Sequence, residues 1–126
     1  MEFKFKQENQ DFKKRRKIYF DMKQKFPVRI PIVCEKDSQS KAKDINKTKY
    51  LINGKATAIQ FYDELRKQNN IQKEEALFLL VNGKYLIADD INLGEIYDKY
   101  HDKDGFLYIV YSFELIWGNI YKYTKF

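Results

Sequence analysis

Residues 106–113, with the sequence FLYIVYSF, limit the possible folds of this chain more than any other segment. A strand with one buried face alternates apolar and polar residues, whereas this segment is apolar at almost every position. We therefore expect a central strand whose sheet is covered on both faces by other parts of the chain.

Three other segments predict the neighbouring strands. Residues 28–36 place apolar side chains at alternate positions, and residues 48–52 form a second short strand signal. Residues 76–81 are an apolar run. Asn82-Gly83 is a strong two-residue hairpin signal, which would return the chain through residues 85–87.

Three segments have the apolar spacing of helices. Asp11 can cap a first helix that runs to about Phe26, where Pro27 stops it. Thr57 and Gln60 form a capping-box pattern before a second helix. In the first helix we expect one apolar face made of Phe12, Tyr19, Met22 and Phe26, with Ile18 beside them. In the second helix the apolar face comprises Ala58, Phe61, Tyr62 and Leu65. A short third helix places Leu93, Ile96, Tyr97 and Tyr100 on one face.

The core order is then strand, strand, helix, strand, short helix, strand. One helix across a four-stranded mixed sheet, with the first and last strands central and parallel, is the β-grasp arrangement of ubiquitin, an α+β fold. At 126 residues the chain has room for one such core. Pro31 conflicts with a central position for residues 28–36, because proline is expected at sheet edges or bulges.

Composition and single residues restrict the function further. The net charge of +6 favours acidic partners, but no nucleic-acid-binding motif accompanies it. Residues 13–17 are a basic run that indicates a solvated helix face and could also touch anionic lipid head groups. The only cysteine, Cys34, predicts a reducing compartment and a small buried side chain. The sole histidine, His101, has no partner residues in the sequence for a metal site or a nucleophile–base pair, so we expect no metal, no cofactor and no enzymatic activity.

A series of short segments, in this order, is similar to one known family. They are Phe12-Lys13-Lys14-Arg15-Arg16, Phe26-Pro27-x-Arg29-Ile30-Pro31, Glu35-Lys36, Lys49-Tyr50-Leu51, Gln60-Phe61-Tyr62, Ala76-Leu77-Phe78, Val81-Asn82, Gly105-Phe106-Leu107-Tyr108 and Trp117-Gly118. From Met1 to Gly118 the chain resembles the autophagy ubiquitin-like modifiers, which include the GABA-receptor-associated proteins. The resemblance implies two extra N-terminal helices on a ubiquitin-like core. It divides the chain into a helical extension (1–26), the core with its conjugation tail (27–118) and a C-terminal extension (119–126).

Gly118 is the residue on which the implied function depends. The resemblance implies that a processing cysteine protease removes residues 119–126. Activating and conjugating enzymes would then join Gly118 to phosphatidylethanolamine, and the cytoplasmic protein would become attached to autophagosome membranes. Glycine suits this chemistry because it has no Cβ to obstruct a narrow catalytic cleft. The alternatives are that Gly118-Asn119 is only a turn and that the chain is an unprocessed ubiquitin-like adaptor.

The resemblance also implies a surface that binds cargo receptors through short peptides with an aromatic residue, two spacers and an aliphatic residue. Such a peptide would add as a strand to the edge of residues 49–52. The implied aromatic pocket comprises Met22, Pro31, Lys49, Leu51 and Phe106, the aliphatic pocket comprises Tyr50, Ile52, Phe61 and Leu65, and Lys47, Lys49 and Arg66 would attract acidic flanking residues. For Phe61 and Leu65, a place in the hydrophobic core is an equal alternative.

Overall fold

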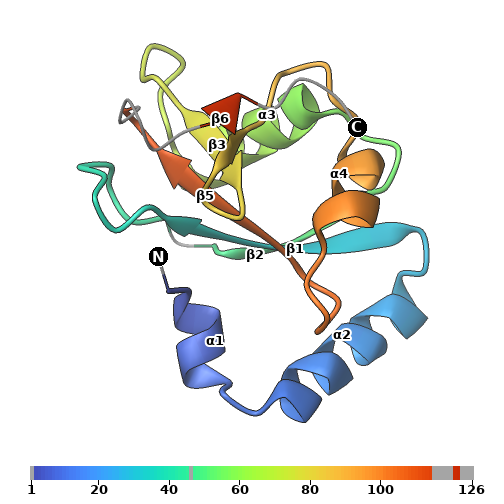
Figure 1. Cartoon of the computed structure of the whole chain (residues 1–126). Helices are drawn as coiled ribbons and strands as arrows, with labels where there is room; N and C mark the ends of the chain where they lie inside the picture. The colour runs from blue at the N-terminus through green and yellow to red at the C-terminus, as the bar shows by residue number, and fades with distance from the viewer. Residues whose placement is uncertain (1, 46, 115–120, 123–126) are drawn as a thin grey trace.

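The computed structural model describes residues 2–45, 47–114 and 121–122. A single sheet runs through the molecule, with two N-terminal helices on one face and two further helices on the other (Figure 1). The elements are α1 (Lys4–Glu8), α2 (Phe12–Lys25), β1 (Arg29–Lys36), β2 (Lys49–Asn53), α3 (Ala58–Asn69), β3 (Phe78–Val81), β4 (Tyr85–Leu86), α4 (Leu93–Tyr100), β5 (Leu107–Ser112) and β6 (Tyr121–Lys122).

The sheet has the strand order β2-β1-β5-β3-β4-β6. β1 is parallel to β5 and antiparallel to β2, so the first and last core strands are central and parallel, as expected. Within the described residues the sheet has six strands rather than the expected four, because the two-residue strands β4 and β6 extend it. β6 lies in the segment expected to be a removable extension, and it pairs in parallel with β4.

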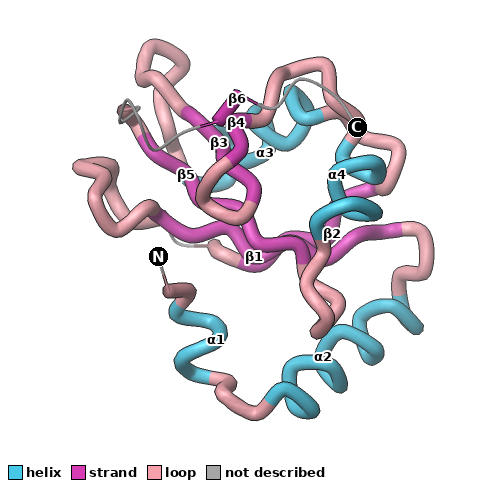
Figure 2. The backbone as a smooth tube through the Cα atoms, viewed as in Figure 1, coloured by secondary structure: helices cyan, strands magenta, loops and turns pink. Residues whose placement is uncertain are grey.

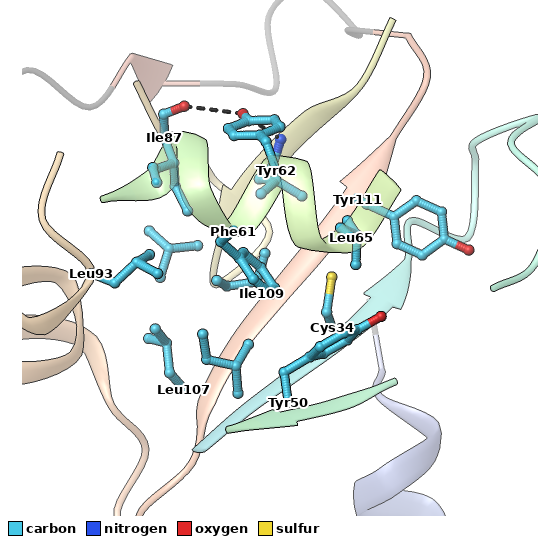
Figure 3. Packing of buried hydrophobic residues seen from close by; sticks show 14 of the residues in the cluster. Cys34, Tyr50, Phe61, Tyr62, Leu65, Ile87, Leu93, Leu107, Ile109 and Tyr111 are labelled. Atoms are coloured by element: carbon cyan, nitrogen blue, oxygen red, sulfur yellow. Dashed lines mark hydrogen bonds between the residues drawn. The ribbon is translucent and has the colours of Figure 1, made fainter. Parts of the chain in front are cut away.

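β5 separates two hydrophobic clusters, which explains why its sequence is apolar at successive positions. Leu107, Ile109 and Tyr111 belong to the larger cluster, on the α3 side of the sheet (Figure 3). Tyr108 and Val110 belong to the smaller cluster, on the side of α1 and α2. All six residues of β5 are buried, which confirms the expected central strand.

Local sequence signals set the helix ends. The Asp11 side chain accepts a hydrogen bond from the Lys13 amide at 3.0 Å and begins α2. The Thr57 amide donates to the Gln60 side chain at 2.9 Å at the start of α3. α3 ends at Asn69, and the next residue, Asn70, caps it in the left-handed conformation with φ of 54°.

The expected apolar face of α2 is wrong at both of its ends. Tyr19 and Met22 pack against the smaller cluster, but Phe12 and Phe26 are 42% and 41% exposed. Arg15 is buried instead, in an ion pair with Asp104, which has no exposed surface. The ion pair and the packing of Tyr19 and Met22 together hold one side of α2 against the rest of the chain.

Pro31 does lie in the central strand β1, where it is buried. It stands opposite Leu51 of β2, while the pairing of β1 with β5 begins one residue later, at Ile32. No residue of β5 is therefore paired with the proline, and the missing amide does not interrupt that ladder.

Candidate functional site

Among the strands that the structure describes, β2 pairs with β1 alone and therefore lies at one edge of the sheet. An edge strand presents backbone amide and carbonyl groups that can pair with an added strand. Along β2, Lys49 and Asn53 are exposed, Leu51 and Ile52 are half-buried, and Tyr50 is buried. The strand predicted to dock a peptide therefore has an accessible backbone edge and accessible side chains.

The predicted aromatic pocket lies where β2 faces the N-terminal helices. The Lys49 ammonium lies 5.2 Å from the centre of the Phe5 ring, and that ring lies 4.9 Å from the ring of Phe106. Met22 packs against the same cluster, and Pro31 is the register partner of Leu51. Met22, Lys49 and Leu51 offer partly or fully exposed surface, whereas Pro31 and Phe106 are buried beneath them.

On the other side of β2, three of the four residues of the predicted aliphatic pocket lie in the larger core. Tyr50, Phe61 and Leu65 are buried, and the Tyr50 and Phe61 rings meet edge to face at 5.4 Å (Figure 3). Only Ile52 is half-buried at the surface. Of the predicted aliphatic pocket, Ile52 therefore offers accessible surface, and Tyr50, Phe61 and Leu65 form part of the core.

Hydrogen bonds hold Tyr50 in this buried position. Its hydroxyl donates to the Lys47 carbonyl at 2.7 Å and accepts from the Asn69 amide at 2.8 Å. Burial raises the pKa of Tyr50 to about 12, although the bond from Asn69 acts in the opposite direction. Tyr50 therefore stays protonated and ties the beginning of β2 to the end of α3.

The three predicted basic residues differ in the contacts that their side chains already make within the chain. The Lys49 side chain is exposed at the start of β2, and the Lys47 ammonium lies 5.2 Å from the Tyr50 ring. The Arg66 guanidinium instead donates to the carbonyls of Gln72 and Glu75, at 2.6 and 2.8 Å. Arg66 thus stabilises the turn after α3, and the two lysines carry most of the charge that an acidic peptide would meet.

A cavity of about 510 Å³ opens between α1 and the start of β2. Its lining includes Lys4 and Phe5 of α1, Glu35 at the end of β1, and Thr48 and Lys49. The sequence did not indicate that Phe5 or Glu35 belongs here. Glu35 accepts hydrogen bonds from the Lys4 and Phe5 amides at 2.7 and 3.0 Å, a contact between a side chain and backbone groups that no sequence pattern reveals.

A buried polar network fixes α2 beside the site. One oxygen of Asp104 accepts from Arg15 Nε at 2.9 Å and from the Tyr108 hydroxyl at 2.5 Å. Its other oxygen accepts from the Phe106 amide at 2.9 Å. Burial and the Asp104 carboxylate raise the pKa of Tyr108. The network therefore joins the helix that carries Met22 to the backbone of Phe106.

The predicted conjugation residue, Gly118, lies outside the described residues. Within the described ranges, no helix has the length and apolarity to cross a bilayer. In the same part of the chain, no group of three or more His, Cys, Asp or Glu side chains could hold a metal ion. Cys34 is fully buried, as expected, and burial raises the pKa of its thiol.

Comparisons with known proteins agree with the fold and extend along nearly the whole chain. A family model described as the ubiquitin-like autophagy protein Atg8 matches residues 14–118. The crystal structure of Trypanosoma brucei ATG8 is similar to this chain, with a TM-score of 0.82 and 33% sequence identity. That match covers 89% of this chain and 95% of the other.

Proposed function

Because the chain belongs to the Atg8 family of ubiquitin-like autophagy proteins, we propose that it is a modifier conjugated through Gly118 to phosphatidylethanolamine. In this role it is a substrate of a processing protease and of activating and conjugating enzymes, and is not itself an enzyme. Conjugation would move it from the cytoplasm to autophagosome membranes. There it would recruit cargo receptors through the edge of β2.

The observation that carries this proposal is where the family match ends. The match stops at residue 118, a glycine, and eight further residues follow it in the sequence. Gly118 comes six positions after Ser112, the last residue of β5. Glycine presents no side chain to an enzyme cleft, which suits a residue whose carboxylate is to be activated and transferred.

The edge of β2 supports the second half of the proposal. An extended peptide can gain main-chain hydrogen bonds along Lys49–Asn53 and place an aromatic side chain beside Met22 and Leu51. Residues that precede the aromatic position would reach the cavity next to Lys49. Acidic flanking residues would be attracted by Lys47 and Lys49.

The decisive experiment compares four forms of the chain in cells with induced autophagy: the parent, Gly118→Ala, a form ending at Gly118 and a form ending at Trp117. Intact mass and membrane fractionation report processing and lipid attachment. We expect the parent to lose residues 119–126, the form ending at Gly118 to conjugate without the protease, and the form ending at Trp117 not to conjugate. Gly118→Ala should block or greatly slow processing.

Gly54→Ala is the matched control, because an added Cβ there would meet nothing closer than 3.5 Å. It should be processed and conjugated like the parent. If Gly118→Ala reaches membranes as a lipid adduct as readily as Gly54→Ala, Gly118 is not the residue that is joined to the lipid. If the parent retains residues 119–126 throughout, the unprocessed adaptor becomes the better description.

A further inference from the structure

The segment between β5 and Gly118 is short, and the structure describes its beginning. β5 ends at Ser112, and Glu114, the last described residue before Gly118, lies four positions from that glycine. Four residues of fully extended chain span at most about 14 Å. The place at which Glu114 is held therefore limits the region around the core that Gly118 can reach.

Glu114 is attached to a loop from the first half of the chain. The loop of residues 37–45 follows β1, and Figure 2 shows it beside the end of β5, at the same end of the sheet. One carboxylate oxygen of Glu114 accepts a hydrogen bond from the Lys41 amide at 2.8 Å. A hydrogen bond to a carboxylate is stronger than one between neutral groups. We call this contact between the Lys41 amide and the Glu114 side chain the tail clamp.

Further hydrogen bonds join the same loop to the residues just before Glu114. The Phe113 amide donates to Ser40 Oγ at 3.4 Å. The Tyr111 hydroxyl donates to the Lys43 carbonyl at 2.8 Å, and the Tyr111 carbonyl accepts from the Asp37 amide at 2.9 Å. The loop and the end of β5 therefore hold each other along several consecutive residues.

The loop is a firm support for Glu114, because part of it belongs to the core. Ala42 is buried in the larger cluster, and its amide donates to Ser40 Oγ at 3.0 Å. The backbone of Glu114 is held as well, since Ser112 Oγ accepts from the Glu114 amide at 3.2 Å and donates to the Glu114 carbonyl at 2.6 Å. Glu114 is thus fixed through both its side chain and its backbone.

We propose that the tail clamp positions Gly118 for the processing protease and the activating enzyme, an inference that rests on the proposed conjugation through Gly118. When Glu114 is already fixed, the tail loses less conformational freedom on entering a catalytic cleft, because ordering each residue of a free backbone costs entropy. Such preorganisation strengthens binding of the tail and leaves the chemistry in the cleft unchanged. Glu114 is therefore a positioning residue, and its effect should appear in KM rather than in kcat.

Two variants of Glu114 separate the hydrogen bond from the charge. Glu114→Ala removes the acceptor, whereas Glu114→Gln removes the charge but keeps an acceptor oxygen on a side chain of the same length. Gln39→Ala is the matched control, because Gln39 is an exposed residue of the same loop and the bond from its amide to Asp37 does not involve its side chain. Circular dichroism during urea denaturation establishes that each variant is folded.

The tail clamp can be measured without any enzyme, because Trp117 is the only tryptophan of the chain and follows Glu114 by three positions. Fluorescence anisotropy of Trp117 in the full, unprocessed chain reports how freely that side chain moves. We expect the anisotropy to fall in Glu114→Ala and to stay at the parent value in Glu114→Gln and Gln39→Ala.

Intact mass follows processing in an extract of cells with induced autophagy, over a range of chain concentrations and with a constant amount of extract. Glu114→Ala should raise the apparent KM for cleavage after Gly118 about fivefold, which is the factor that corresponds to a hydrogen bond of ordinary net strength. It should leave the maximal rate unchanged. Glu114→Gln should raise the apparent KM about twofold at most, and Gln39→Ala should behave like the parent.

Lower Trp117 anisotropy and a higher apparent KM in Glu114→Ala, both restored in Glu114→Gln, would support the proposal. Unchanged anisotropy in the folded Glu114→Ala chain would overturn it, as would a fall in the maximal rate alone. Equal increases in KM for Glu114→Ala and Glu114→Gln would also overturn it, because the enzyme would then recognise the charge of Glu114 directly.

The same measurements separate this proposal from the proposed function. If Glu114→Ala is cleaved like the parent at every concentration, the tail clamp has no role in processing, and the Gly118 proposal stands. If the parent is not cleaved after Gly118, the Gly118 proposal fails and the role of Glu114 in processing fails with it. The Trp117 anisotropy still decides in that case whether Glu114 restrains the tail.

Discussion

The ion pair between Arg15 and Asp104 should contribute more to stability than any other charged contact that the structure describes. Its side chains are 10% and 0% exposed, whereas every other described ion pair has a partner at least 37% exposed. Arg15→Met would keep an unbranched apolar side chain but remove the guanidinium, and it would leave the Asp104 carboxylate buried without its cation. Asp104 would retain only the Tyr108 hydroxyl and the Phe106 amide as donors.

Removing one partner of a buried pair costs about 3–5 kcal/mol, because the remaining charge cannot be rehydrated. The bonds from Arg15 to the Asn9 and Gln10 carbonyls are also lost, but those carbonyls are only partly buried and can bind water. We therefore expect Arg15→Met to lower the free energy of unfolding by about 3 kcal/mol. Arg16→Met is the matched control: the Arg16 guanidinium donates to the exposed Lys103 carbonyl and lies over the Tyr19 and Phe20 rings, and losing these exposed contacts should cost less than about 1 kcal/mol.

Urea denaturation followed by circular dichroism measures both losses, on a chain small enough for two-state unfolding. Asp104→Asn, alone and combined with Arg15→Met, completes a double-mutant cycle. We expect the double variant to be more stable than the two single losses predict by about 2 kcal/mol. Equal losses of stability for Arg15→Met and Arg16→Met would refute the reasoning. So would a double variant whose loss equals the sum of the two single losses within about 0.5 kcal/mol.

Three further predictions concern the docking edge and the response to acid. Leu51→Ala should weaken binding of an aromatic-x-x-aliphatic peptide with acidic flanks by about 1–3 kcal/mol in fluorescence anisotropy, and unchanged affinity in the folded variant would move the site elsewhere. Lys49→Glu should slow association of that peptide, with a loss that shrinks as salt rises, whereas a salt-independent loss would contradict an electrostatic role. Burial opposes ionisation of Asp102, but the Asp104 amide and the Lys6 ammonium outweigh it and lower the Asp102 pKa. The ionised Asp102 carboxylate therefore stabilises the fold above the ordinary aspartate pKa of about 3.9, and this stabilisation is lost as the pH falls below that value. Asp102→Asn should remove this dependence, so the urea midpoint of the variant should fall less steeply with acid than that of the parent.

Several parts of the fold could be predicted because the signals are local. Alternation, the Asn82-Gly83 turn and the cap at Asp11 depend on neighbouring residues, and the structure confirms the elements they predicted. The two-sided burial of β5 was predictable because consecutive apolar residues leave no face for solvent. Strands of two residues, such as β6, give no periodic signal, and the sheet was therefore expected to have fewer strands.

The site was harder to predict, because its residues are defined by distant partners. Arg15 is one of five consecutive basic residues, and only Asp104, 89 positions away, distinguishes it from its neighbours. Phe61 and Leu65 have the spacing of a helix face, but spacing does not reveal whether that face reaches the surface, and the structure buries both. The docking role of Leu51 and Lys49 stays a prediction, and both residues lie on β2, an edge strand of the sheet.

The unequal edges of the sheet affect how copies of the chain can associate. Cleavage after Gly118, as proposed, would remove β6 and leave the two-residue β4 at that edge, opposite the five-residue β2. Growth of a filament by strand pairing needs two different edges on each subunit, each long enough to pair with the next copy. The processed chain would have only one such edge, so pairing through β2 would end at a symmetric dimer, and a peptide bound along β2 would prevent even that.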